Sequence, residues 1–236
     1  MTALAYALAA AAANLAGAAA VTWRATWSVR ALEFVIALAA GFMVSVAMLD
    51  MMPHAYATGG ETAAAVALGG FLAVHLTQHT LAPHFHFGEE THAVSELVSV
   101  SALIGLMVHT MVDGVAIASA AAAGPALGAL VFLAIALHKL PEGLAIASLF
   151  LAAGAGRARA FIAAALLGAA TILGALATPH IPMLAHWGLA LSAGVTLYVG
   201  ASNLIPEFQG KSGWRLQAGF FAGVGLYAAA RILVGA

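Results

Sequence analysis

The stretch HTMVDGVAIAS at residues 109–119 is followed by a near copy, HKLPEGLAIAS, at residues 138–148. Each copy carries a histidine and a carboxylate four residues apart, which places both side chains on one face of a helix. The sequence around both copies is apolar, and an ionisable side chain inside a membrane helix is costly and usually functional. The two copies therefore predict a helical membrane protein with a polar site between two of its helices.

The composition agrees with this class of protein. Only 7% of the 236 residues are charged, against roughly 25% in soluble domains, and the mean hydropathy is +1.02. The net charge of −1 and the lack of a basic run argue against a nucleic-acid partner. Cysteine is absent, which excludes thiolate metal ligands. We expect one integral membrane domain, residues 1–236, that lies in a lipid bilayer.

Apolar segments of about 20 residues predict eight transmembrane helices. The breaks between them contain proline, glycine or charged residues, as at Gly124-Pro125. The predicted helices cover residues 2–21, 33–52, 62–82, 97–120, 126–151, 159–178, 187–206 and 214–234.

Basic residues in the predicted loops define an orientation. They occur only in the first, fifth and seventh loops, as Arg24, Arg30, Arg157, Arg159, Lys211 and Arg215. Because basic loops stay in the cytosol, this pattern places both termini outside.

Two distant segments are related at a constant offset of 153 residues. AGFMVSV at 40–46 matches AGVTLYV at 193–199, and each is followed by a proline, Pro53 or Pro206. The loop charges give the two segments opposite orientations, and inverted repeats are common in secondary transporters. We expect a 3+2+3 arrangement of repeat 1 (about 2–82), a central helix pair (about 97–151) and repeat 2 (about 159–234).

The central pair carries the predicted site. His109 and His138 each lie near the middle of a span, and the short Gly124-Pro125 turn makes the two helices antiparallel neighbours. Imidazoles and carboxylates together bind borderline divalent metals such as zinc. We predict that the metal ligands are His109, Asp113, His138 and Glu142.

A metal site inside a membrane predicts a transporter, with zinc as the expected cargo and no organic cofactor. The alternative is an intramembrane metal-dependent enzyme or metal sensor that uses the same site. A hydrolytic zinc enzyme favours a His-Glu-x-x-His motif, which the chain lacks. We therefore predict that the protein is not an enzyme.

The paired motifs, His-x-x-x-Asp-Gly and His-Lys-x-Pro-Glu-Gly, resemble those of the ZIP (Zrt/Irt-like protein) metal transporters. The resemblance extends to the eight spans, the outside termini and the proline-ended second and seventh spans. It implies movement of zinc, iron, manganese or cadmium toward the cytosol, and commonly a homodimer. We expect the protein in a bacterial inner membrane.

The chain departs from this resemblance at the place of a second metal ion. Family members with two ions have Asn after the first motif histidine, a carboxylate after the second, and a glutamate on span six. This chain has Thr110, Lys139 and no acidic residue on span six, where Thr171 is the best match. We predict that the Lys139 ammonium replaces the second ion, so that one metal binds.

Further residues are predicted along the pathway. The resemblance offers Met43 as a thioether ligand, with ordinary packing as the alternative. Asp50 and His54 are expected at the outer mouth, and Asn203 and Glu207 at the repeat-related cytosolic end.

A histidine-rich region is expected on the cytosolic side, where an exiting ion arrives. His75 and His79 form an i, i+4 pair on the third span. The loop that follows is either a weak metal-binding tract or a polar loop without that role, and its candidate ligands are His84, His86, Glu89, Glu90 and His92.

Overall fold

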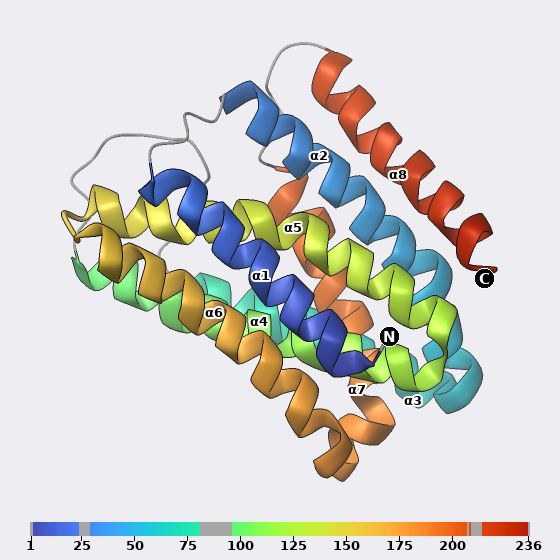
Figure 1. Cartoon of the computed structure of the whole chain (residues 1–236). Coiled ribbons are helices and arrows are strands. Elements are labelled where there is room, and N and C mark those ends of the chain that lie inside the picture. Colours follow the sequence, from blue (N-terminus) through green and yellow to red (C-terminus); the bar gives the residue numbers. More distant parts are fainter. Residues whose placement is uncertain (1, 24–28, 81–95, 207, 209–213, 236) are drawn as a thin grey trace.

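The computed structural model describes residues 2–23, 29–80, 96–206, 208 and 214–235, and the described chain is helical without strands (Figure 1). The all-α prediction is confirmed. The long helices are α1 (Ala3–Thr22), α2 (Val29–Val46), α3 (Met52–Thr80), α4 (Glu96–Ala123), α5 (Pro125–Ala152), α6 (Arg157–Ala177), α7 (Pro182–Tyr198) and α8 (Trp214–Val234). Short segments are the π-helical η1 (Ala47–Met51) and η3 (Val199–Leu204) and the 3₁₀-helical η2 (Thr178–His180).

Seven stretches of the described chain are long and apolar enough to cross a membrane. Six match single predicted spans, and the seventh, Glu33–Thr77, is a continuous stretch of 45 residues that covers the second and third predicted spans. The structure has helix where the sequence predicted a loop over residues 53–61. The helical geometry breaks only at Gly60, whose φ of 57° and ψ of −143° suit a residue without a side chain.

The chain reverses direction at this glycine. Gly59, beside the break, approaches Trp187 near the start of α7. Farther from the break in both directions, the chain lies at the C-terminal end of α7. Before the break Met43 approaches Gly200, and after it His75 contacts Tyr198. The stretch Glu33–Thr77 therefore runs along α7 in one direction and returns in the other.

Pairs of helices meet through glycine without intervening side chains. A Cβ on Gly114 of α4 would collide with the carbonyl oxygen of Thr171 on α6, and a Cβ on Gly174 of α6 would collide with that of Met111 on α4. The same reciprocal contact joins α1 to α5 through Gly17 and Gly143. It joins α2 to α8 through Gly41 and Gly223, and α3 to α7 through Gly70 and Gly194. Small residues at these crossings allow the close backbone approach that is common between membrane helices.

These crossings fall into two groups of helices. α1 and α6 pack on α5 and α4 around the predicted site, and α1 crosses in front of α5 in Figure 1. α2 and α8 lie side by side at the upper right, and α3 packs along α7. The contacts also follow the sequence repeat, since Leu38 and Gly41 lie 153 residues before Leu191 and Gly194 and make the matching crossings.

The two π-helical segments occupy matching positions of the repeat. In η1 the N–H of Met52 donates to the carbonyl of Ala47, and in η3 the N–H of Ile205 donates to Gly200 at 3.2 Å. Each donor directly precedes a proline, which has no N–H of its own. The same local chemistry therefore widens the helix at both positions.

Candidate metal centre

The two motif copies bring the four candidate ligands together between α4 and α5. One ligand atom from each of His109, Asp113, His138 and Glu142 lies within 4.8 Å of the others. All four side chains are buried, with exposed fractions of 2–6%. The helical i, i+4 spacing places each pair on one face, and the packing of α4 against α5 turns these faces toward each other.

The ring nitrogens converge on the carboxylates. Asp113 Oδ2 lies 3.3 Å from His138 Nε2 and 3.4 Å from His109 Nε2. Glu142 Oε2 lies 3.7 Å from His109 Nε2 and 3.9 Å from His138 Nε2. Two nitrogens and two oxygens around one point form a donor set that suits zinc and related divalent transition metals.

The backbone orients one of the two imidazoles. His138 Nδ1 lies 3.1 Å from the carbonyl oxygen of Ala134, one turn earlier on α5. A ring N–H that donates to this carbonyl leaves Nε2 with its lone pair directed into the site. The other ring has no such bond among the described residues, where His109 Nδ1 is buried and without a partner.

Lys139 supplies a positive charge inside the cluster. Its Nζ lies 2.8 Å from Asp113 Oδ2, and 3.0 Å and 2.9 Å from the two carboxylate oxygens of Glu142. The side chain is fully buried, so the ammonium does not extend to a membrane surface. Lys139 therefore bridges the two carboxylates that belong to different motif copies.

Asn14 of α1 is a member of the site that the sequence analysis did not identify. Its Nδ2 donates to Glu142 Oε1 at 3.2 Å, and the side chain is fully buried. One signal was present in the sequence, since Asn14 is a carboxamide within an alanine-rich span. Nothing local to that span indicates which helix the carboxamide contacts.

Thr110 and Thr171 are buried, but their hydroxyls bond within their own helices. Thr110 Oγ1 donates to the carbonyl of Met107 at 3.1 Å, and Thr171 Oγ1 donates to that of Leu167 at 3.3 Å. Thr171 approaches the site through its backbone, which packs on Gly114.

The other predicted pathway residues lie on the second group of helices. Met43 is fully buried in the apolar core. The Asp50 carboxylate accepts a hydrogen bond from the Tyr227 hydroxyl at 2.5 Å and lies 3.3 Å from Arg231 Nε, so α8 holds it. Asn203 lies in η3, the segment that matches η1.

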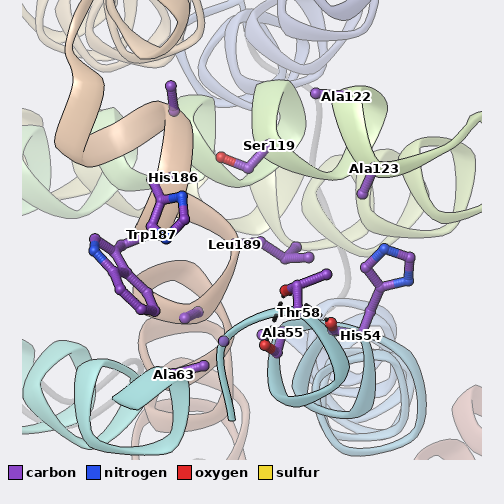
Figure 2. A pocket seen from close by; sticks show the side chains of 13 residues that line it. His54, Ala55, Thr58, Ala63, Ser119, Ala122, Ala123, His186, Trp187 and Leu189 are labelled. Atoms are coloured by element: carbon purple, nitrogen blue, oxygen red, sulfur yellow. Dashed lines mark hydrogen bonds between the residues drawn. The ribbon is translucent and has the colours of Figure 1, made fainter.

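His54 lines a pocket of about 260 Å³ between the start of α3, the end of α4 and the start of α7 (Figure 2). His186, to which the sequence assigned no role, lines it from α7, and Ser119 from α4. Ser119 lies six residues beyond Asp113 on the same helix, a rise of about 9 Å. The pocket is therefore close to the candidate metal centre, on the side of the α4 C-terminus.

Of the remaining predicted residues, the structure describes the side chain of His75 alone. His75 lies near the end of α3, where its ring contacts Tyr198. The side chain of its partner His79 is not described. The predicted residues that lie outside the described part of the chain are His84, His86, Glu89, Glu90, His92 and Glu207.

Comparison with known proteins adds one match. The sequence model of a protein family described as ZIP zinc transporter matches residues 86–230, which include both motif copies. No curated protein matches the chain.

Proposed function

Since the chain belongs to the ZIP zinc transporter family, we propose that it carries zinc across a membrane through the site formed by His109, Asp113, His138 and Glu142. It is an integral membrane protein of a family whose members are transporters of divalent metals rather than enzymes. Iron, manganese and cadmium are the alternative cargoes. Movement toward the cytosol, a homodimer and a bacterial inner membrane are further parts of the proposal, which rest on the family resemblance.

One observation carries the proposal. Four buried ligand atoms from two neighbouring helices lie within 4.8 Å of one another inside an apolar bundle. Burial of four polar groups at one point costs free energy unless they pair or bind an ion. Two imidazole nitrogens and two carboxylate oxygens supply the four ligands that a tetrahedral zinc site uses.

Lys139 supports a single ion. Its ammonium lies within 3.0 Å of oxygens from both carboxylates, and a second divalent ion at those oxygens would meet its charge at close range. We therefore expect one zinc per chain at this site. Metal analysis of purified protein measures this directly, and two stoichiometric ions bridged by Asp113 and Glu142 would contradict it.

An eight-span, 3+2+3 inverted topology with both termini outside accounts for the packing. It is supported by the reversal at Gly60, which lets the stretch Glu33–Thr77 cross the membrane twice. The α2–α8 and α3–α7 glycine crossings and the paired segments η1 and η3 recur at matching positions of the repeat. The basic residues of the predicted loops support the orientation.

The pocket beside α4 supports an entry route from the predicted outer side. Its histidines, His54 and His186, offer exchangeable nitrogen ligands to an arriving ion. In this topology the ion passes Ser119 before it reaches Asp113. Met43, Asn203, Glu207 and the histidine-rich loop after α3 stay predicted parts of the pathway.

Zinc flux into sealed proteoliposomes with a zinc-sensitive dye inside tests the function. Wild type is compared with His138→Ala and Glu142→Ala, and with His180→Ala as a control, since His180 is exposed and outside the cluster. We expect saturable flux in wild type and control, and loss in both site variants at normal yield. If wild type binds zinc at this site but moves none of the four metals, the protein is a sensor or an enzyme instead.

A further inference from the structure

We infer that Asn14 is a positioning residue that sets metal selectivity by restricting Glu142 to one ligand oxygen. This inference rests on the proposed function, because it assigns a role within the same metal site. It concerns α1, which carries none of the ligands and whose carboxamide was not identified from the motifs.

The backbone holds Asn14 in place. A Cβ on Gly143, the residue after Glu142, would collide with both the backbone carbonyl and the side-chain Oδ1 of Asn14. In return, a Cβ on Gly17 would collide with the carbonyl of Leu140 on α5. Two glycines thus let α1 and α5 meet at backbone distance, and the carboxamide occupies the space that a side chain at position 143 would fill.

The carboxamide divides the two oxygens of Glu142 between different tasks. Lys139 Nζ donates to both oxygens, at 3.0 Å to Oε1 and 2.9 Å to Oε2, whereas Asn14 Nδ2 donates to Oε1, at 3.2 Å. The imidazole nitrogens of His109 and His138 face Oε2. Asn14 therefore makes the two oxygens unequal, because Oε1 has two donors and Oε2 has one. Glu142 then presents Oε2 to an ion, and one atom from each of the four residues converges.

Four donor atoms suit zinc better than larger or harder ions. Zinc prefers tetrahedral sites with nitrogen ligands, whereas manganese favours oxygen ligands and higher coordination numbers. When the Asn14 donor is removed, Lys139 still contacts both oxygens equally, and Oε1 becomes as available to an ion as Oε2. The site then gains oxygen ligation and loses part of its preference for zinc.

The chain contains a matched control at the crossing of α6 with the α4 motif copy. Thr171 packs its carbonyl on Gly114 as Asn14 packs on Gly143. The Thr171 hydroxyl, however, donates to Leu167 on its own helix and to no ligand. Thr171→Val therefore changes the equivalent packing position on α6 and removes no hydrogen bond to the candidate ligands.

The test measures initial zinc and manganese fluxes for wild type, Asn14→Ala and Thr171→Val in proteoliposomes, together with zinc binding to the detergent-purified full chain. For Asn14→Ala we expect a rise in the KM and Kd for zinc of about tenfold, a near-normal maximal zinc rate and a lower zinc-to-manganese ratio. Thr171→Val should match wild type. Wild-type values for Asn14→Ala, or equal changes in both variants, would overturn the inference.

Two further variants separate positioning from packing. In a Glu142→Gln background, Asn14→Ala should add little to the loss of zinc affinity, because a positioning residue acts through that carboxylate. Full additivity would overturn the inference. If Asn14→Ala does not fold, Asn14→Asp keeps the volume and replaces the donor by a carboxylate, which must also lower the zinc-to-manganese ratio. Absence of zinc flux in wild type would refute the proposed function, not this role.

Discussion

The α4 and α5 copies of the motif share a backbone arrangement but differ in their polar surroundings. On the α4 side, the hydroxyls of Thr110 and Thr171 donate to carbonyls of their own helices. On the α5 side, the matching residues Lys139 and Asn14 both donate to Glu142. The two motif copies therefore place the candidate ligands symmetrically, and the unmatched side chains give the two carboxylates different partners.

The largest expected effect comes from the lysine that breaks this symmetry. Lys139→Met leaves Asp113 and Glu142 buried without their ammonium, and removal of one partner of a buried ion pair costs about 3–5 kcal/mol. We expect a much lower melting temperature for metal-free protein in detergent with a chelator. Zinc should restore more stability to this variant than to wild type, because bound cation replaces the missing charge.

The matched substitution on α4 is Thr110→Val. Its hydroxyl bonds only within its own helix among the described residues, so the stability should change by less than about 1 kcal/mol. Equal melting temperatures for the two variants would show that the ammonium does not hold the carboxylates together.

The glycines of the two copies test whether the backbone arrangement is symmetric. Gly114→Ala and Gly143→Ala each force a Cβ onto a backbone carbonyl, of Thr171 or of Asn14, and overpacking costs about 1–3 kcal/mol. We expect similar losses of melting temperature and yield. Gly69→Ala is the control, because a Cβ there meets no atom within 4 Å. A harmless substitution at one motif glycine alone would refute the symmetric packing.

A smaller effect is expected where α8 packs on α2. Tyr227→Phe removes the hydroxyl that donates to Asp50, a bond to a charged group, while Arg231 still faces the carboxylate. A loss of about 1.5 kcal/mol is expected. Tyr198→Phe, at the matching α7–α3 crossing, removes only a 3.4 Å contact with His75 and should cost less. Denaturation of both variants in the same detergent compares them, and the reverse order would contradict this ranking.

The smallest effect is expected at the end of the α4 copy. Ser119 is buried, and its Oγ has no hydrogen-bond partner among the described residues. Ser119→Ala should leave the stability within about 0.5 kcal/mol of wild type. A large loss of melting temperature would mean that the hydroxyl has a partner, such as a bound water in the adjoining pocket.

Local sequence patterns predicted the helices well, and they identified the four side chains that the fold brings together. Apolar segments with few charges indicated membrane helices, and i, i+4 spacing indicated which side chains share a face. The prediction was less accurate at residues 53–61, where Pro53 and the two glycines suggested a loop. The helix continues there because the π-helical turn accommodates the proline, and Gly60 alone adopts the reversing conformation.

The sequence by itself determined the membrane class and the four side chains of the candidate site, because both depend on composition and short-range periodicity. Only the tertiary structure decided which oxygen each donor reaches. Asn14 and Glu142 are separated by 128 residues, and no local pattern reports that two glycines let α1 and α5 meet. Asp50 is a second example. Its spacing to His54 predicted an entry residue, whereas the packing of α8 makes the Tyr227 hydroxyl a hydrogen-bond donor to its carboxylate.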